Sequence, residues 1–322
     1  MTTILITGGA GFIASHLCRY LLEHTDWRVV TLDRLDPAGD QRRLAPLVEQ
    51  FGKRLAVVFH DLRAEINPER LRAYGDFTYV AHLAAGSHVD RSIRDPISFI
   101  EDNVLGTAHL LEYVRHHQPM CQKALVFSTD EVHGAAPDGV VFGEHARYWP
   151  TNPYAAGKAG GEVLCPAWAE QYGMPLVVTH CSNVYGPTQD REKFIPLASE
   201  KIRNGAVVQI HSKDGKSSSR LYIHVDDVSR AVLTILTRGG IIMGPESGFY
   251  NIVTSRELSN LYVAEQIAAV LNKPLYAELV ERPPNRPRPD QRYAMSGEKL
   301  AALGWSPQVD FETGLRGALG VG

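Results

Sequence analysis

A tyrosine and a lysine four residues apart, Tyr154 and Lys158, are suited to acid–base chemistry. Residues at that spacing share one face of a helix. A phenol has an unperturbed pKa of about 10, so it acts as a base near neutral pH only where nearby positive charge favours the phenolate. The Lys158 ammonium could supply that charge. The same two residues could also be an ordinary polar pair on the surface of an amphipathic helix.

Three polar residues, Thr129, Asp130 and Glu131, follow the apolar run at 124–128. The Thr129 hydroxyl could hold a substrate oxygen beside Tyr154. Neighbouring carboxyl groups push their pKa values apart, so one can act as an acid and the other as a base. A single acidic residue here would be typical of a strand exit that caps a helix. The presence of two favours a catalytic function.

A glycine-rich segment near the N-terminus indicates a dinucleotide site. Gly8, Gly11 and Ala14 lie between an apolar run at 3–7 and a helical stretch at 11–24. Glycine permits a tight turn and a close approach of the backbone to a pyrophosphate, which the N-terminus of the following helix attracts. A glycine-rich turn occurs in many α/β proteins, but here the strand and the helix that the motif requires flank it.

Acidic residues end the next two apolar runs. Asp33 lies where a carboxylate binds the ribose hydroxyls of adenosine and repels a 2′-phosphate, so we predict NAD rather than NADP. Arg34 follows directly and could weaken that preference. Asp61 with Leu62 could contact the adenine, although an aspartate in a loop is also a common cap. The small residues around Ala84 suit a backbone that lies close to the cofactor.

The first 180 residues alternate short apolar runs with helical stretches, which is typical of a parallel sheet covered on both faces. We therefore predict an α/β fold, a Rossmann-type doubly wound parallel sheet. The expected strands are 3–7, 27–33, 55–60, 78–83, 124–128 and 176–179. The expected helices are 11–24, 41–51, 67–74, 97–117 and 153–172.

The alternation ends after Val184, where we predict a smaller C-terminal substrate-binding lobe over the carboxyl ends of the strands. The elements expected beyond that point are a strand at 221–225 and helices at 226–237 and 256–271. We expect an NAD-binding Rossmann domain from residues 1–183 with about 220–252, and a substrate-binding lobe from 184–219 with about 253–322.

Charge and composition narrow the function classes. The 322 residues include 33 Lys and Arg against 36 Asp and Glu, so no basic excess favours nucleic acid. No apolar run approaches the ~20 residues of a membrane span. Glycines interrupt the first apolar stretch, which argues against a signal peptide. The four cysteines are widely spaced, as in proteins of a reducing compartment, so we expect a cytoplasmic protein with no metal site.

The combined motifs resemble the extended short-chain dehydrogenase/reductases, and among them the NDP-sugar dehydratases of the dTDP-glucose 4,6-dehydratase type. The motifs are T-G-G-A-G-F-I at 7–13, H-L-A-A-G-S-H-V-D-R-S-I at 82–93, F-S-T-D-E-V-H-G at 127–134, Y-A-A-G-K at 154–158, S-N-V-Y-G-P at 182–187 and E-K-F-I-P-L at 192–197. The Thr-Asp-Glu triplet is the most discriminating part, because epimerases of this superfamily lack the carboxylate pair.

The resemblance implies NAD-dependent dehydration of an NDP-glucose to the NDP-4-keto-6-deoxy-glucose, a hydro-lyase reaction. Tyr154 would take the proton of the 4-hydroxyl, Thr129 would hold that oxygen, and Lys158 would hold the nicotinamide ribose. Glu131 would then remove the proton on carbon 5, and protonated Asp130 would donate to the leaving 6-hydroxyl. Hydride would pass from carbon 4 to NAD and return to carbon 6. dTDP-glucose is the expected substrate and UDP-glucose the alternative.

The resemblance also implies binding residues. Those for the cofactor are Gly8, Gly11, Phe12, Ile13, Asp33, Asp61, Leu62, Ala84, Tyr154 and Lys158. Those for the nucleotide sugar are Ser87, Asp90, Asn183, Glu192, Lys193, Arg220, Asn285, Arg286 and Tyr293. The sequence departs from the family at three positions: Gly86 replaces the usual Glu, His133 a Tyr and Pro289 a His.

We expect a homodimer built from the helices at 97–117 and 153–172, with close approach allowed by the small residues Ala155, Ala156, Gly160 and Gly161. Two other classes of function remain open, a different enzyme on the same scaffold and a protein without catalytic activity. A 4-epimerase or decarboxylase could use the same scaffold, although an epimerase needs no carboxylate pair for elimination. A non-catalytic NAD-binding protein is the other alternative, although such proteins tend to lose the Tyr/Lys pair.

Overall fold

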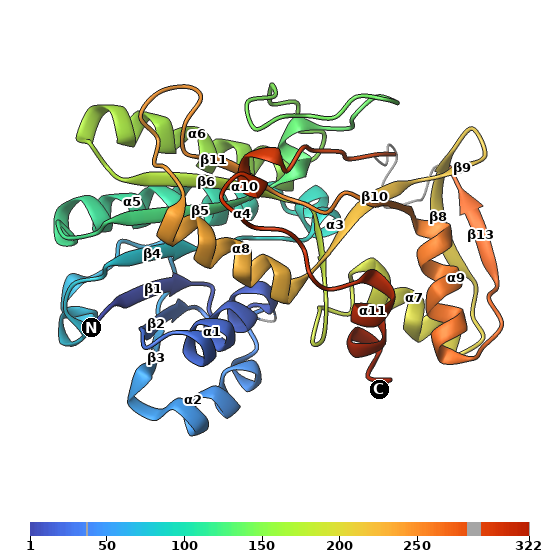
Figure 1. Cartoon of the computed structure of the whole chain (residues 1–322), viewed down its shortest axis with the longest axis horizontal. Coiled ribbons are helices and arrows are strands. Elements are labelled where there is room, and N and C mark those ends of the chain that lie inside the picture. The colour runs from blue at the N-terminus through green and yellow to red at the C-terminus, as the bar shows by residue number, and fades with distance from the viewer. Residues whose placement is uncertain (37, 282–290, 322) are drawn as a thin grey trace.

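The computed structural model describes residues 1–36, 38–281 and 291–321. Within these ranges the central element is a seven-stranded parallel sheet in the order β11-β6-β5-β4-β1-β2-β3 (Figure 1). The strands are β1 (Thr3–Thr7), β2 (Arg28–Asp33), β3 (Leu55–Phe59), β4 (Tyr79–His82), β5 (Lys123–Thr129), β6 (Leu176–Cys181) and β11 (Phe249–Ile252). The order reverses at β1, so the predicted doubly wound Rossmann-type sheet is confirmed.

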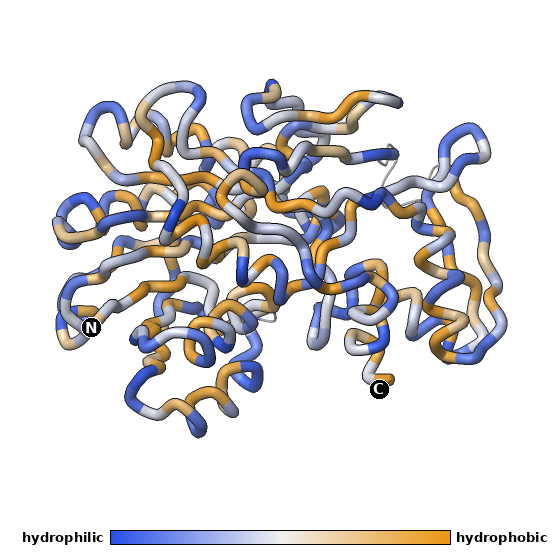
Figure 2. Tube along the Cα trace, in the orientation of Figure 1, coloured by the Kyte–Doolittle hydropathy of each residue, from blue (hydrophilic) through white to orange (hydrophobic). Residues whose placement is uncertain are grey.

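Helices pack on both faces of this sheet. One face carries α1 (Phe12–His24) and α8 (Val225–Arg238), and the other carries α5 (Gly106–His117) and α6 (Pro153–Tyr172). Successive residues of a strand point to opposite faces, so Ile4 and Ile6 pack with α1 while Leu5 packs with α5. Because both faces of the inner strands are buried, most of their residues are apolar, as Figure 2 shows for much of the central sheet.

A second group of elements lies beyond the carboxyl ends of the strands, on the right in Figure 1. It contains two three-stranded sheets, β12-β10-β7 and β13-β8-β9, within the described residues. The strands are β7 (Asn183–Tyr185), β8 (Val208–Lys213), β9 (Lys216–Ser217), β10 (Ser219–His224), β12 (Glu257–Ser259) and β13 (Ala277–Val280). Helices α7 (Phe194–Arg203), α9 (Asn260–Leu271) and α11 (Phe311–Leu319) surround a separate apolar core there.

Several expected helices differ from the structure. The stretch at 67–74 forms two 3-10 turns, Pro68–Arg70 and Arg72–Tyr74, because a segment this short gains little from isolated helix formation. The stretch at 41–51 begins as a 3-10 turn, Gln41–Arg43, and continues as α2 (Ala45–Phe51). Residues Glu257–Ser259 pair with β10, so α9 begins later than expected.

The expected helix at 97–117 is interrupted. It consists of α4 (Pro96–Ile100), a π-helical segment at Glu101–Leu105, and α5. Helix α6 packs closely on that segment. A side chain at Gly161 would overlap the carbonyl oxygen of Asn103, and one at Gly160 would lie 2.8 Å from Val104 Cγ2. These two glycines therefore allow α6 to lie close to the π-helical segment of the same chain, and the homodimer stays a prediction.

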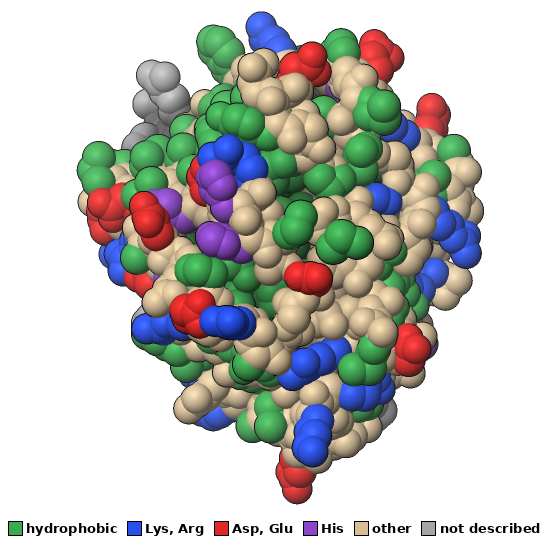
Figure 3. Space-filling view, turned by 90° about the vertical axis from the view of Figure 1, so that its left-hand side faces the viewer, with side chains coloured by type: hydrophobic (Ala, Val, Ile, Leu, Met, Phe, Trp, Pro, Cys, Tyr) green, Lys and Arg blue, Asp and Glu red, His purple; other side chains and the backbone are tan. Residues whose placement is uncertain are grey.

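The described part of the chain has no helix long and apolar enough to cross a membrane. Figure 3 shows the side of the molecule that lies at the left of Figure 1, beside the amino ends of the strands. Basic and acidic side chains are interspersed on this side.

Candidate active site

A cavity of about 280 Å³ lies at the carboxyl edge of the central sheet. The ends of β1, β2, β4 and β5 form its floor, and residues from β7 and the start of α7 close the opposite side. The carboxyl edge at the point where the strand order reverses is where sheets of this type bind ligands. All five predicted catalytic residues and all ten predicted cofactor residues line this one cavity.

The glycine loop fits a pyrophosphate. Gly8 has a φ of +73°, and a Cβ there would lie 2.7 Å from the backbone nitrogen of Ala84, so only glycine suits this position. Gly11 is the N-cap of α1, and no side chain caps the first turn of that helix. Phe12 and Ile13 in this turn line the cavity. The open amide groups and the helix dipole can therefore hold an anion there.

Asp33 closes the other end of the same loop. Its Oδ2 accepts a hydrogen bond from the Ala10 amide at 2.9 Å, and its Oδ1 accepts one from the Leu35 amide at 2.7 Å. Burial raises the pKa of the Asp33 carboxyl, although these two backbone hydrogen bonds oppose the shift. The carboxylate is thus fixed at the end of β2, with a second lone pair on each oxygen for ribose hydroxyls.

Two elements bring the catalytic candidates together. Strand β5 ends at Thr129, whose Oγ1 donates a hydrogen bond to Asp130 Oδ1 at 3.1 Å and accepts one from the Glu131 amide at 3.3 Å. Helix α6 carries Tyr154 in its first turn. Its N-cap Asn152 links the two elements, because the Asn152 Nδ2 donates to Glu131 Oε2 at 3.0 Å.

The two carboxyl groups differ in protonation behaviour. Burial, followed by the negative charge of Glu131, raises the pKa of Asp130 to about 7, while Arg220 opposes the shift. A carboxyl group with such a pKa keeps its proton for a substantial fraction of the time near neutral pH. Asp130 can therefore serve as a general acid next to a second carboxylate.

The protein groups around Tyr154 do not favour the phenolate on their own. Burial and the charge of Glu131 raise the pKa of Tyr154, while a hydrogen bond with Thr129 lowers that pKa. Base catalysis by the phenol would need a lowered pKa, so the overall shift is in the opposite direction. Burial also lowers the pKa of Lys158 to about 8. The Lys158 Nζ donates to the carbonyl oxygen of Phe127 at 2.6 Å, which fixes it on β5. The protein by itself therefore favours the phenol over the phenolate.

The buried carboxylate of Glu162, close to Lys158 on α6, was not predicted. Glu162, one helical turn after Lys158, accepts a hydrogen bond from Tyr148 at 2.6 Å and contacts His180 Nε2 at 2.7 Å. Burial would raise the pKa of Glu162, but His180 and these hydrogen bonds lower it overall. The negative charge of Glu162 in turn raises the pKa of Lys158 against the effect of burial. Lys158 and Glu162 are four residues apart, and this spacing on a helix was the sequence signal that the two side chains lie close together.

The predicted sugar-nucleotide residues are only partly gathered at the cavity. Ser87, Asn183 and Lys193 line it, and Lys193 Nζ donates to the Ser87 carbonyl at 2.9 Å. Glu192 lines a neighbouring cavity of about 740 Å³, where Arg91 and His88 bind its carboxylate at 2.6 Å and 3.0 Å.

The remaining predicted substrate residues lie elsewhere. Asp90, Arg220 and Tyr293 lie outside both cavities. The Arg220 guanidinium stacks over the Tyr293 ring at 4.6 Å, and its Nη1 donates to the Gln291 carbonyl at 3.0 Å. Asn285 and Arg286, together with the departure at Pro289, lie outside the described residues.

The other two departures from the family pattern are accommodated by packing. A Cβ at Gly86 would lie 3.0 Å from Phe99 Cδ1 and 3.2 Å from Asp102 Oδ2, so a larger residue would displace both side chains. His133 is buried, with its ring stacked on Tyr148 and edge-on to His180.

Comparisons with known proteins agree with the predicted resemblance to nucleotide-sugar dehydratases. The family of GDP-mannose 4,6 dehydratase matches residues 5–318. The chain is 37% identical to dTDP-glucose 4,6-dehydratase 1 of Escherichia coli (strain K12), over 97% of this chain and 90% of that protein. A crystal structure of a dTDP-glucose 4,6-dehydratase from Streptomyces venezuelae with NAD and TYD bound has a TM-score of 0.87 at 33% identity, covering 99% of this chain and 96% of that one.

The scaffold is also shared with epimerases. The crystal structure of the UDP-glucose 4-epimerase of Thermus thermophilus in complex with NAD has a TM-score of 0.85 at 29% identity, covering 99% of this chain and 98% of that one. The fold alone therefore does not separate elimination from epimerisation, and the residues at the end of β5 must do so.

Proposed function

The chain belongs to the GDP-mannose 4,6-dehydratase family, and from this membership we propose that it catalyses the NAD-dependent dehydration of an NDP-glucose to the NDP-4-keto-6-deoxy-glucose. dTDP-glucose is the substrate we expect first, because relatives over nearly the whole chain are dTDP-glucose 4,6-dehydratases. UDP-glucose is the alternative, because a plant relative carries UDP-glucose 4,6-dehydratase in its name.

One observation carries the proposal: a buried carboxyl group and a second carboxylate share the cavity with Tyr154. Dehydration across carbons 5 and 6 needs both a base and an acid. Glu131 removes the proton on carbon 5, which a neighbouring 4-ketone has made acidic. Asp130, whose pKa is raised to about 7 by burial and by Glu131, donates its proton to the 6-hydroxyl as it leaves as water.

The other cavity residues serve the preceding oxidation. Thr129 holds the 4-oxygen of the sugar, and Tyr154 takes its proton. Lys158, fixed by the Phe127 carbonyl, holds the ribose next to the nicotinamide. NAD, when bound, supplies the hydride acceptor and donor for carbons 4 and 6, together with a positive ring charge that favours the phenolate.

The binding roles follow the lining of the cavity. The glycine loop and Asp33 take the pyrophosphate and the adenosine ribose, and Asp61 with Leu62 takes the adenine. Ser87, Asn183 and Lys193 are the described residues best placed for the sugar nucleotide. In this arrangement the central sheet binds the cofactor, and the elements beyond its carboxyl edge bind the nucleotide.

Mass spectrometry in heavy water tests the proposal. The purified chain is incubated with NAD and, in separate reactions, with dTDP-glucose, UDP-glucose or a nucleotide-linked uronic acid. Dehydration gives a product lighter by one water that carries solvent deuterium at carbon 5. A product of unchanged mass that chromatography separates from the substrate would instead indicate a 4-epimerase, and loss of carbon dioxide from the nucleotide-linked uronic acid would indicate a decarboxylase. NAD binding without any conversion would indicate a non-catalytic protein.

A further inference from the structure

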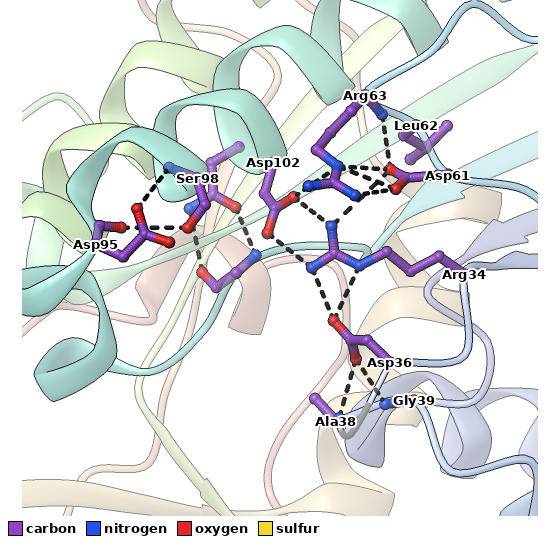
Figure 4. A network of polar contacts seen from close by, with 12 residues as sticks. Arg34, Asp36, Ala38, Gly39, Asp61, Leu62, Arg63, Asp95, Ser98 and Asp102 are labelled. Atoms are coloured by element: carbon purple, nitrogen blue, oxygen red, sulfur yellow. Dashed lines mark hydrogen bonds and ion pairs between the residues drawn. The ribbon is translucent and has the colours of Figure 1, made fainter.

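Arg34, next to the ribose-binding position of Asp33, lies between two carboxylates from different parts of the chain (Figure 4). Its Nε and Nη2 donate to Asp36 Oδ2 at 2.9 Å and 2.7 Å. Its Nη1 donates to Asp102 Oδ1 at 2.5 Å, and its Nη2 donates to Asp102 Oδ2 at 2.9 Å. These contacts use four of the five N–H groups of a guanidinium.

The contact with Asp102 occupies a particular edge of Arg34. Nη1 and Nη2 form the fork that binds carboxylate or phosphate through two parallel hydrogen bonds. Asp36 holds the other edge, through Nε and Nη2. An arginine beside the end of the second strand is also the group that accommodates the 2′-phosphate of NADP in related sheets. Asp102 therefore fills the place on Arg34 that such a phosphate would need.

Neighbouring residues hold Asp102 in this position. Asn103 pins the adjacent segment, because its side chain accepts a hydrogen bond from the Gly86 amide at 2.8 Å and donates to the Gly86 carbonyl at 3.1 Å. The missing side chain at Gly86 leaves room for the Asp102 carboxylate, which would otherwise meet a Cβ at 3.2 Å. The side chain of Asp102 is 9% exposed, so water competes little for the contact.

The charge around Arg34 acts in the same direction. Asp33, Asp36, Asp61 and Asp102 surround Arg34 and Arg63, which leaves an excess of two negative charges at this end of the cavity. Arg63 is itself paired with Asp61 at 2.5 Å. A 2′-phosphate would meet repulsion here, whereas a ribose hydroxyl would not.

We propose that Asp102 determines the cofactor specificity of this enzyme: it occupies the guanidinium fork of Arg34 and thereby excludes NADP. This inference rests on the proposed NAD-dependent function. By its type and position, Arg34 suits a 2′-phosphate, but in this chain its guanidinium binds the carboxylate of Asp102. The preference for NAD is therefore set by a residue that lies 68 positions from Arg34 in the sequence.

Calorimetric titration with NAD⁺ and NADP⁺ tests this without any turnover. The parent chain should bind NAD⁺ at least about tenfold more tightly than NADP⁺. Asp102→Asn removes the charge and breaks the paired contact while keeping the shape. It should strengthen NADP⁺ binding about tenfold and change NAD⁺ binding little. Asp102→Ser should do the same, so the test does not depend on one variant. Adding Arg34→Ala to Asp102→Asn should abolish the gain.

Asp95→Asn is the matched control. Asp95 lines the adjoining cavity and caps α4, a role that Asn fills equally well, and the substitution removes the same charge. It should leave the ratio of the two affinities unchanged. Equal affinities in the parent, no gain in either Asp102 variant, or an equal gain in Asp95→Asn would each overturn the proposal while NAD binding stands. A parent that binds neither dinucleotide would overturn the proposed function as well.

Discussion

Asp130 and Glu131 are adjacent carboxyl groups that the fold places in unequal surroundings. Asp130 is 4% exposed and receives a hydrogen bond from Thr129. Glu131 is half-buried, and Asn152 at the start of α6 holds its Oε2. Two groups that are chemically almost the same are thus separated by environment into a proton donor and a proton acceptor.

The pKa of Asp130 predicts a pH dependence of elimination. The protonated fraction falls about tenfold per pH unit above the pKa, which here is about 7. We therefore expect single-turnover dehydration of the sugar to slow along this curve as the pH rises. Binding of NAD, measured in the same buffers, serves as the control. A dehydration rate that keeps rising well above this pH would contradict the role of Asp130 as the acid.

The same pKa affects stability. The folded pKa of Asp130 lies above the unfolded value of 3.8, so the folded state holds the extra proton between 3.8 and about 7, and stability falls as the pH rises through that range. Above pH ~7, Asp130→Asn should therefore raise the free energy of unfolding by up to about 4 kcal/mol relative to the parent. The variant should accordingly unfold at a higher temperature than the parent. The difference should shrink in acid. Thermal unfolding followed by circular dichroism across this range measures it.

We predict that Glu131→Gln retains NAD binding and oxidation at carbon 4 but loses dehydration by about 10²–10⁴-fold, the usual contribution of a general base. Reduction of NAD by the sugar and release of the dehydrated product are measured separately. Glu170→Gln, at an exposed position of α6, is the matched control and should leave both steps intact. Dehydration at the parent rate in Glu131→Gln would remove Glu131 from the mechanism.

We predict that Tyr154→Phe abolishes both oxidation and dehydration, because it removes the phenol that takes the proton of the 4-hydroxyl. The Tyr154 backbone amide donates to Ser92 Oγ at 3.0 Å, so the position of the residue should survive the change. NAD affinity measured by titration checks that the cavity is intact. Turnover at the parent rate would eliminate the tyrosine-dependent mechanism.

We predict that Gly161→Ala lowers the free energy of unfolding by several kcal/mol, roughly as strongly as other overpacked core substitutions. Its Cβ would overlap the Asn103 carbonyl and lie 2.9 Å from Thr107 Oγ1. Gly317→Ala is the matched control in α11, since nothing lies within 4 Å of its added Cβ. That control should be neutral or stabilise the protein by about 0.4–1 kcal/mol. Equal effects at both positions would contradict the packing argument.

We predict a homodimer that uses the outer surfaces of α4, the π-helical segment and α6. Ile97, Leu105 and Val163 expose apolar side chains there, at 67%, 42% and 48%. Light scattering should give twice the chain mass of 35.6 kDa, and Ile97→Glu should halve it. Leu279→Glu, at an exposed position of β13 in the group of elements on the right of Figure 1, should leave the mass unchanged. A parent mass near that of one chain would contradict the dimer.

Local sequence patterns were enough to predict several elements and motifs of this protein. The apolar run at 3–7 and the helix at 153–172 were predicted at the bounds that the structure shows, because burial on both faces and an Asn-Pro helix start leave strong local signals. The glycine loop and the motifs around Tyr154 were likewise recognisable, because their chemistry depends on residues close together in the chain.

The charge states and the pairing of these groups depend on contacts between segments that are far apart in the sequence. Arg34 suited a 2′-phosphate by its type and position, yet Asp102 from a distant helical segment occupies its fork. Gly161 was predicted to allow close helix approach in a dimer, and in the structure the segment that it accommodates belongs to the same chain. A pKa or a contact depends on every neighbour within a few ångströms, and most of these neighbours are distant in the sequence. Spacing along the chain therefore indicated which chemistry was possible, and packing assigned it to particular residues.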